Sequence, residues 1–260
     1  MESLWVAKTG LDAQQTRMSV VSNNLANINT VGFKKARAIF EDLLYQNMGQ
    51  VGGSTSQDTQ DPSGFNVGTG VRVAGTDRNF AQGSYVGTDN PLDVMIDGRG
   101  FFQVLLPDGG LAYSRDGGFK IDADGRLVTA TGYELQPAVT IPDGVESLTI
   151  SADGIIEAKL TGQAGPVTLG TMQIADFVNP AGLQPRGQNL YVETVASGTP
   201  NLGTPGLEGL GAIAQGALEG SNVNVVEELV NMIETQRAYE MNSKAISVSD
   251  QMLEYLNNNL

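Results

Sequence analysis

The sequence predicts an α+β protein. Helices at the two ends of the chain are expected to pair as an α-helical coiled-coil domain. A central antiparallel β-rich, partly barrel-like domain and an extended connecting arm lie between them. Three observations support this fold: apolar residues repeat every seven positions near both termini, polar and apolar residues alternate through the middle, and a stretch rich in glycine and small polar residues separates the two patterns. The predicted limits are 1–36 and 221–260 for the helical domain, 37–88 and 196–220 for the connecting segment with its arm, and 89–195 for the β-rich domain.

The first predicted helix covers residues 2–28 and carries a heptad repeat. Two series interleave along it: Leu4, Leu11, Met18 and Leu25, and Ala7, Gln14, Val21 and Ile28. All of these residues except Gln14 are apolar, and the alternating spacing of three and four is that of a coiled-coil seam.

An asparagine-rich segment, SNNLANINTVGFKK (22–35), ends this helix. Asparagine is a poor helix former because its amide competes for backbone hydrogen bonds. Asn23, Asn24 and Asn27 lie off the apolar seam at spacings that place them on one surface. Capping of the helix explains part of this pattern, and in a tube built of many copies such a patch can satisfy backbone groups of an adjacent subunit. Gly32 is suited to the left-handed conformation at the end of the segment.

A second short helix is predicted at 34–46, with Ile39, Leu43 and Leu44 on one side. The stretch that follows, 47–70, is rich in Gly, Ser, Thr, Gln and Asp and has no helical period. It is expected to be a mobile loop or an extended arm that a neighbour orders.

The middle of the chain, about 71–195, alternates with period two between turn signals. Residues 92–137 contain at least five predicted strands separated by Asp-Gly and Gly-Gly turns, and Ser151–Gly154 is a further predicted hairpin turn. Asp122–Gly125 resembles part of a calcium loop. That alignment puts Lys120 and Thr131 at the first and the bidentate ligand positions, which these residues do not fill, so a hairpin turn is predicted there too.

The last segments are a Pro- and Gly-rich linker at 197–211 and a long helix at 221–260 that Asn222 or Asn224 can cap. This helix is acidic, whereas the first 40 residues are basic, and the opposite charges favour pairing of the two ends. An apolar seam of this length requires further partners, which is typical of a polymer subunit. The seam of the last helix repeats every seven residues: Met232, Tyr239, Ile246, Leu253 and Leu260.

Composition excludes several classes of function. The formal net charge is −14 and the pI is about 4.3, so nucleic acid is not an expected partner. The chain has no cysteine and no histidine, which excludes disulfides, thiolate nucleophiles, Cys/His zinc sites and histidine-dependent triads. No phosphate loop or nucleophile elbow occurs, so no enzyme activity, metal or cofactor is predicted. No apolar run approaches the roughly 18 residues that span a membrane, and the first residues lack the pattern of a secretory signal peptide.

Some residues fit two interpretations. Trp5 fits core packing or an anchor in a subunit interface. Arg237 and Tyr239 fit contacts between chains, while pairs within the helix between Arg237 and Glu234 or Glu240 are the simpler alternative. One basic group fits a solvated face or a contact with the acidic C-terminal helix of a neighbour: Lys34, Lys35 and Arg37.

Several motifs resemble those of one known family. They are spread over nearly the whole chain: SLWVAKTGLDAQQTRMSVVSNNLAN, SNNLANINTVGFK, FEDLLYQ, GFFQVLLPDG, AYSRDGGF, LVTATGYELQPAVTIP and SNVNVVEELVNMIETQRAYEMNSKA. These motifs resemble the bacterial flagellar basal-body rod and hook family, and together they are most similar to its distal-rod members.

The resemblance implies a structural subunit that assembles with copies of itself into a straight helical tube. The paired terminal helices would line a narrow export channel, and the tube would transmit motor torque through the periplasm to the hook. The arm at about 47–70 would pack on neighbouring subunits and keep the shaft straight. The residues expected to carry self-assembly are Leu4, Trp5, Leu11, Met18, Val21, Asn23, Asn24, Leu25, Asn27, Ile28, Gly32, Phe33, Met232, Arg237, Tyr239, Ile246 and Leu253.

The same resemblance implies partners and a location. The partners are further copies of the chain, proximal rod proteins, the hook and hook junction, the P- and L-ring proteins around the rod, and the flagellar type III export apparatus. The location is the basal body, reached without a cleaved signal peptide.

Three alternatives remain. The chain could be a hook or proximal rod subunit of the same family. It could also be a cell-wall-binding β-module, which would need an aromatic-lined groove and a carboxylate pair. A membrane-active protein is the third, although the acidic last helix argues against binding to anionic lipid.

Overall fold

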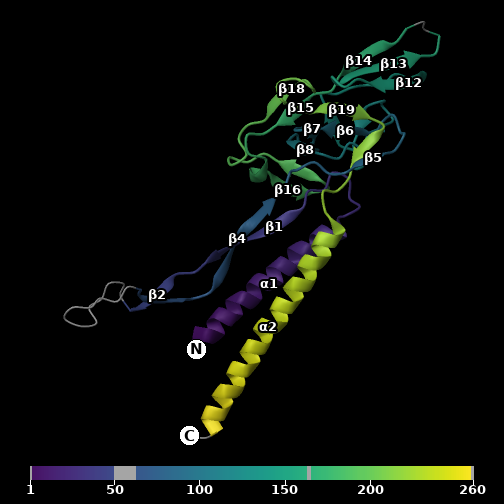
Figure 1. The fold of residues 1–260 in the computed structure, drawn as a ribbon. Coiled ribbons are helices and arrows are strands. Elements are labelled where there is room, and N and C mark those ends of the chain that lie inside the picture. Colours follow the sequence, from purple (N-terminus) through teal and green to yellow (C-terminus); the bar gives the residue numbers. More distant parts are fainter. Residues whose placement is uncertain (1, 50–62, 163–164, 259–260) are drawn as a thin grey trace. The chain divides into compact units, whose positions relative to one another are not determined.

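The computed structural model describes residues 2–49, 63–162 and 165–258, and it has the α+β composition that the sequence predicts (Figure 1). Its helices are α1 (Glu2–Ala26) and α2 (Val225–Asn258). The chain forms two compact units. We call the first, made of Met1–Ala26, Ala36–Asp77 and Asn224–Leu260, the helical unit, and the second, made of Asn27–Lys35 and Arg78–Val223, the β unit.

The strands are short and follow one another closely along the chain. They are β1 (Ala36–Asp42), β2 (Tyr45–Gly49), β3 (Phe65–Gly68), β4 (Val71–Arg78), β5 (Tyr85–Gly87), β6 (Val94–Asp97), β7 (Phe101–Leu105), β8 (Leu111–Ser114), β9 (Lys120–Ile121), β10 (Leu127–Val128), β11 (Glu134–Gln136), β12 (Val145–Ile150), β13 (Ile155–Leu160), β14 (Val167–Thr171), β15 (Ile174–Asp176), β16 (Gln184–Gly187), β17 (Leu190–Val192), β18 (Asn201–Gly203), β19 (Ala212–Gln215) and β20 (Ala217–Glu219), with a 3-10 turn at Pro180–Gly182.

In the helical unit, α1 and α2 lie side by side and run in opposite directions (Figure 1). Both helices form close to the predicted positions. The predicted cap of the second helix is confirmed at Asn224, whose Oδ1 accepts hydrogen bonds from the backbone N–H groups of Val226 at 3.0 Å and Glu227 at 3.4 Å. The two acidic residues of this first turn, Glu227 and Glu228, lie where the helix dipole favours negative charge.

The predicted helix at 34–46 is wrong, because most of this segment forms the strands β1 and β2. β1 pairs with β4, and β2 pairs with β3. Cross-strand ion pairs reinforce the first pairing: Arg37 with Asp77 at 2.9 Å and Arg72 with Glu41 at 2.7 Å. Pairing with a distant strand therefore overrides the local helical pattern. The arm predicted at 47–70 begins and ends in the β2–β3 hairpin, and its residues 50–62 lie outside the described part of the chain.

The β unit is built around one large sheet in the order β16-β17-β8-β7-β11-β10-β9, with β15 also pairing with β7. β7 is buried on both faces: Phe102 packs in the main core, while its neighbour Phe101 packs in a second cluster with Tyr113 and Phe177. β12, β13 and β14 form a separate three-stranded sheet at one end of the unit (Figure 1). The strand order is an open path, so the partly barrel-like character that we predicted is not confirmed.

The predicted hairpin turns are confirmed in this unit. Asp122–Gly125 connects β9 to β10, with Gly125 at φ 77°, and Ser151–Gly154 connects β12 to β13, with Gly154 at φ 82°. Both glycines adopt the left-handed conformation that a side chain disfavours.

Candidate assembly surface

The contact between α1 and α2 is made largely by small and polar side chains. On α2 the residues that face α1 recur at spacings of three and four, with Glu228 and Thr235 buried and Ala238 and Asn242 half-buried. On α1, Gly10 allows a close approach, because a Cβ atom there would lie 3.0 Å from Nδ2 of Asn242. The predicted coiled coil, with a seam of large apolar residues, is therefore not confirmed within one chain.

Polar contacts fix the register of the two helices. Arg17 Nη2 donates a hydrogen bond to Asn231 Oδ1 at 3.4 Å and lies 3.7 Å from the carboxylate of Glu234. Glu234 thus pairs with Arg17 of the other helix. The simpler alternative paired it with Arg237 of its own helix. The buried Thr235 donates its hydroxyl hydrogen to the carbonyl of Asn231 at 2.6 Å, one turn earlier in the same helix.

The large apolar side chains of α2 lie mainly on the face turned away from α1. We call this face the outer stripe. Its members recur at intervals of three, four or seven or more residues along one side of the helix and are all exposed: Val226, Val230, Ile233, Met241, Val248, Met252 and Tyr255. A soluble helix normally buries its apolar stripe against its own domain, so an exposed stripe of this length indicates an interaction surface.

The predicted assembly residues of α1 are partly covered within the helical unit. Val21 is buried, Leu4, Leu11, Met18 and Leu25 are half-buried, and Trp5 is exposed. The Lys8 Nζ atom lies 5.5 Å from the centre of the Trp5 ring, so this tryptophan contacts a cation of its own helix and does not pack in a core.

The predicted residues of α2 divide in the same way. Met232 and Ile246 are half-buried, whereas Tyr239 has a relative exposure of 37% and Leu253 one of 47%. Every described side chain of α2 after Ser249 is exposed. Arg237 is exposed on the side of the outer stripe, and Leu260 lies outside the described residues.

Asn24 has a different role from the one that the sequence suggested. It is buried, its Oδ1 accepts a hydrogen bond from the Ala36 N–H at 2.9 Å, and its Nδ2 donates to the Ala36 carbonyl at 2.8 Å. The amide therefore pairs with the first residue of β1 as a strand would, so both of its groups make hydrogen bonds within its own chain. Asn23 remains exposed, and Asn27 accepts a hydrogen bond from the Thr30 hydroxyl at 3.1 Å within the β unit.

Gly32, Phe33 and Lys34 belong to the β unit and are buried there, while Ile28 is half-buried. Gly32 has φ 68°, and a Cβ atom on it would lie 2.8 Å from backbone atoms of Arg115 and Asp116. Glycine is thus required at this position both by conformation and by space.

Lys34 is not part of a solvated basic face, because its side chain is buried in an ion cluster. Its Nζ donates hydrogen bonds to Glu219 Oε1 at 2.6 Å and to the Ala81 carbonyl at 2.8 Å. Arg115 Nη1 donates to the other oxygen of Glu219 at 3.3 Å. Burial lowers the pKa of Lys34, and the nearby carboxylate of Glu219 opposes that shift.

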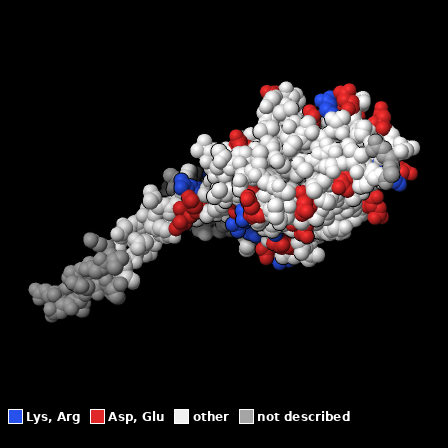
Figure 2. Space-filling view, turned by 90° about the horizontal axis from the view of Figure 1, so that it is seen from above, with Lys and Arg blue, Asp and Glu red and all other residues white. Residues whose placement is uncertain are grey.

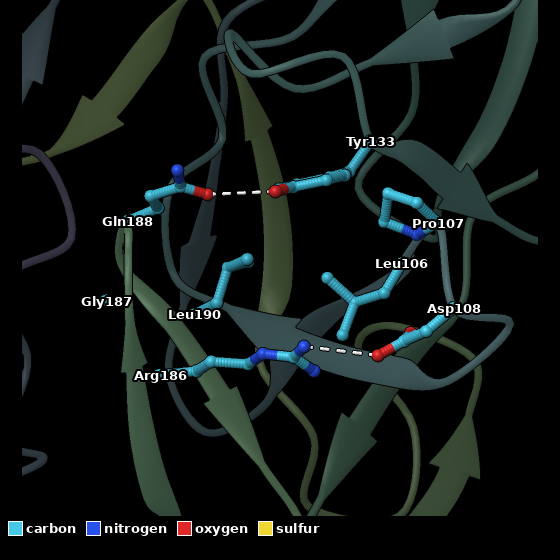
Figure 3. Close-up of a pocket in the computed structure, with 8 residues that line it drawn as sticks. All are labelled: Leu106, Pro107, Asp108, Tyr133, Arg186, Gly187, Gln188 and Leu190. Atoms are coloured by element: carbon cyan, nitrogen blue, oxygen red, sulfur yellow. Dashed lines mark hydrogen bonds and ion pairs between the residues drawn. The ribbon is translucent and has the colours of Figure 1, made fainter.

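The turns at one end of the large sheet enclose a hollow of about 400 Å³ (Figure 3). Leu106 and Leu190 lie in its centre between two polar pairs, Arg186 with Asp108 at 3.1 Å and Tyr133 with Gln188 at 3.0 Å (Figure 3). One aromatic ring and one carboxylate do not make the aromatic-lined groove with two carboxylates that a carbohydrate-binding module would need.

Other site classes receive no support from the described residues. Within residues 2–49, 63–162 and 165–258, no group of three or more acidic side chains is arranged to hold a metal ion. None of the helices described is both long enough and apolar enough to cross a membrane. Figure 2 shows acidic side chains scattered among fewer basic ones over the visible face, without a basic patch.

Three family models match segments of the chain. Residues 4–34 match the flagella basal body rod protein model, residues 95–158 match the flagellar hook protein FlgE/F/G D1 domain, and residues 214–259 match the C-terminal model of the flagellar basal body rod FlgEFG proteins. The segments include both terminal helices and a central part of the β unit.

Relatives match over almost their full length. The flagellar basal-body rod protein FlgG of Buchnera aphidicola subsp. Schizaphis graminum is 55% identical over 254 residues, with 98% of each chain covered. FlgG of Borreliella burgdorferi is 48% identical over 260 residues, covering 99% of this chain and 98% of the relative. FlgG of Bacillus subtilis is 37% identical over 268 residues, with the same coverage of 99% and 98%.

The matched helices and β segment assign the chain to the class of flagellar rod and hook proteins, as the motifs predicted. The identity of 37% to 55% along nearly the whole length of these relatives narrows this class to one family. The chain belongs to the family of flagellar basal-body rod proteins.

Proposed function

We infer that this chain is a structural subunit of the flagellar distal rod. Copies of the chain assemble into a straight helical tube that lines the export channel and transmits motor torque through the periplasm to the hook. The observation that carries this inference is the outer stripe of α2, which leaves large apolar residues exposed while small and polar residues fill the contact with α1. Burying such a stripe against neighbouring copies releases apolar surface from water, at about 25 cal/mol for each Å².

The coiled-coil contacts predicted from the heptads form between copies in this proposal. Exposed residues such as Trp5, Tyr239 and Leu253 supply contacts that one chain cannot complete. The predicted division into an inner helical domain, a connecting segment with its arm and an outer β-rich domain describes the layers of the tube. Hook or proximal rod subunits are less favoured, because the full-length relatives at 44% to 55% identity carry the name of a single rod protein.

The arm is proposed to stiffen the tube. Its described part, the β2–β3 hairpin, exposes Tyr45, Met48 and Phe65, and Leu44 beside it is exposed as well. Two paired strands with exposed aromatic side chains are marginal on their own and gain stability by packing on another surface. Neighbouring subunits supply that surface in a rod.

The remaining partners follow from this position in the flagellum. Proximal rod proteins and the hook junction contact the two ends of the tube, and the P- and L-ring proteins surround it. The type III export apparatus delivers the chain to the basal body. The chain carries out no catalysis in this role.

Substitutions on the outer stripe test the proposal. Val230→Asp combined with Ile233→Asp places two charges on the stripe, and electron microscopy of the assembled protein should then show no rods. Ser247→Asp is the matched control, because Ser247 is an exposed residue on another side of α2. Circular dichroism should show unchanged secondary structure in both variants. Normal rods from the doubly charged variant would disprove the role of the stripe.

A further inference from the structure

We propose that the β units of successive copies contact one another head to tail, with Val195 of one copy inserted into the hollow of the next. This inference rests on the proposed function, because it assumes that copies assemble, and it adds a second self-contact outside the terminal helices. The occupant of the hollow is a second copy of this chain.

The inserted part is a pair of tied loops with two projecting valines, which we call the valine knob. Val195 has a relative exposure of 103% and Val178 one of 93%, so neither side chain is covered by its own chain. Single exposed apolar residues are common on protein surfaces. Here, however, two almost completely exposed valines lie on loops that contact each other, so they form one apolar projection.

The loops that carry the valine knob are held firmly together. Asn179 Nδ2 donates to the Ala196 carbonyl at 3.0 Å, and Thr194 Oγ1 donates to the Gly182 carbonyl at 2.7 Å. The chains also approach closely, since a Cβ atom on Gly182 would lie 2.7 Å from the backbone of Ala196. A loop fixed in this way loses little conformational freedom when it binds, which favours binding.

The receiving hollow has an apolar centre and polar rims (Figure 3). Leu106 and Leu190 lie at its centre, and Pro107 and the ring of Tyr133 lie beside them (Figure 3). At the rims Arg186 bonds to Asp108 and Tyr133 bonds to Gln188, so a branched apolar side chain can reach the two leucines while both of these bonds stay intact.

The valine knob and the hollow lie at opposite ends of one hairpin. β16 and β17 pair with Gln184 opposite Val192 and Gly187 opposite Leu190. The turn of this hairpin, Gly187–Asn189, borders the hollow, whereas Val192 at the other end leads directly to Glu193, Thr194 and Val195. The two surfaces therefore cannot meet within one copy.

Contact between different surfaces on identical subunits is heterologous, and it continues from copy to copy unless a rotation closes a ring. Repetition of this contact thus gives an open line of β units. Such a line suits a helical rod, whereas a two-fold contact would stop at a dimer.

Charge adds to the fit. The side chain of Glu193, two residues before Val195, is exposed. Arg186 at the rim of the hollow bonds to Asp108 through Nη2, and its guanidinium has further donors to offer. Insertion of Val195 brings the Glu193 carboxylate of one copy to the rim that carries Arg186 of the next.

Cysteine crosslinking tests the contact, because the chain has no native cysteine. The full-length Val195→Cys, Pro107→Cys double variant is assembled into rods and oxidised, and non-reducing electrophoresis should show a ladder of covalent multimers. An equal mixture of the two single variants should give crosslinked dimers only, because each chain then carries one half of the contact. Each single variant alone should stay monomeric on the gel.

Straight rods that give no ladder would overturn this inference and leave the proposed function intact. A ladder from protein that forms no rods would support the contact between β units and count against the proposed function instead. The two ideas can therefore fail separately.

A second variant avoids reliance on disulfide geometry. Val195→Asp should raise the concentration of half-maximal assembly by about tenfold, the effect expected when one buried apolar contact is lost. The control is Ile121→Asp, which also charges an exposed apolar residue but lies in β9, at the far end of the sheet order from β16. Equal effects of the two substitutions would contradict the contact.

Discussion

Lys34 Nζ lies 2.6 Å from Glu219 Oε1, and both side chains are buried in the β unit. The same carboxylate bonds to Arg115 at 3.3 Å and accepts a hydrogen bond from the Gly83 N–H at 2.8 Å. One carboxylate thus serves two cations, and it ties the segment Asn27–Lys35 to β20. The segments at both ends of the β unit are held at this point.

Removing the shared charge should destabilise the β unit strongly. Glu219→Gln leaves two buried cations without a counter-charge, and the expected loss is about 3–5 kcal/mol of unfolding free energy. Lys34→Met should cost less, because Glu219 keeps Arg115 and the Gly83 N–H. Urea unfolding of the full chain measures both.

An exposed ion pair in the same unit serves as the control. Glu146 and Lys159 lie 3.1 Å apart with relative exposures of 59% and 55%, so Glu146→Gln should change stability by less than about 1 kcal/mol. If Glu219→Gln behaved like this control, the ion cluster would not be what holds the segment.

The Asn24 amide should protect one backbone group of the helical unit. Asn24→Ala removes both hydrogen bonds to Ala36, and the expected cost is about 1–3 kcal/mol because a buried donor and acceptor lose their partner. Hydrogen exchange at the Ala36 N–H should accelerate, while Asn29→Ala, an exposed amide in the same motif, should leave that rate unchanged. An unchanged rate in Asn24→Ala would show that the amide does not hold β1.

Tyr113 should make stability depend on pH in the alkaline range. Burial, with a smaller contribution from Glu193, raises the pKa of Tyr113 from 10.0 to about 12. The unfolded tyrosine loses its proton near pH 10, whereas the folded one keeps it until about 12. Ionisation therefore stabilises the unfolded chain first, and stability falls as the pH rises from 10 to 12.

Tyr113→Phe should weaken this pH dependence, and part of it should remain because burial also raises the pKa of Tyr191. Tyrosinate absorbance followed during titration should lose a component near pH 12 in the variant. The hydroxyl of Tyr113 is buried and has no partner among the described residues, so the substitution should also leave stability near neutral pH equal or higher. A clear loss of stability at neutral pH would mean that the hydroxyl makes a bond on which the fold depends.

Much of the fold follows from local sequence patterns. The segments that were predicted wrongly are those whose structure depends on residues distant in the sequence. The cap at Asn224 and the turns at Asp122–Gly125 and Ser151–Gly154 depend on neighbouring residues, so the sequence predicts them. The segment Ala36–Asp42 has a local helical pattern, which led to the prediction of a helix. It forms a strand because it pairs with Val71–Arg78, and that partner is too distant in the sequence for a local pattern to reveal it.

Residues of the candidate sites were missed for the same reason. Lys34 looked like one of a basic group, but its partner Glu219 is 185 positions away, and no local signal marks that pairing. On α2 the heptad pattern pointed to Met232 and Tyr239, whereas the contact with α1 centres on Thr235 and Asn242. Small residues allow close helix contact but contribute little to an apolar pattern, so a search for apolar repeats passes over them.

Gly32 should tolerate substitution less well than a glycine of similar conformation in open space. Gly32→Ala combines positive φ with a clash against the Arg115 backbone, whereas Gly132 has φ 87° and no atom within 4 Å of the place that a Cβ atom would take. Gly132→Ala should cost about 1 kcal/mol from backbone strain alone. Gly32→Ala should cost clearly more in the same thermal unfolding experiment, and equal costs would mean that the surrounding backbone moves aside.

Gly10 allows a test of the helix contact in which two substitutions have opposite effects. Gly10→Ala requires only a small shift of the Asn242 amide, a flexible side-chain end, and it improves helix propensity by about 1 kcal/mol, so stability should stay equal or rise. Gly10→Leu cannot fit at this distance and should push the helices apart, at a cost of about 1–3 kcal/mol. Hydrogen exchange of the α2 backbone around Asn242 should slow or stay unchanged in the first variant and accelerate in the second. Ser19→Leu, at an exposed position of α1, controls for the added apolar surface and should leave exchange near Asn242 unchanged. If Gly10→Leu left the exchange of α2 unaltered, close contact at Gly10 would not be what aligns the two helices, and the polar contacts of Arg17 with Asn231 and Glu234 would have to suffice.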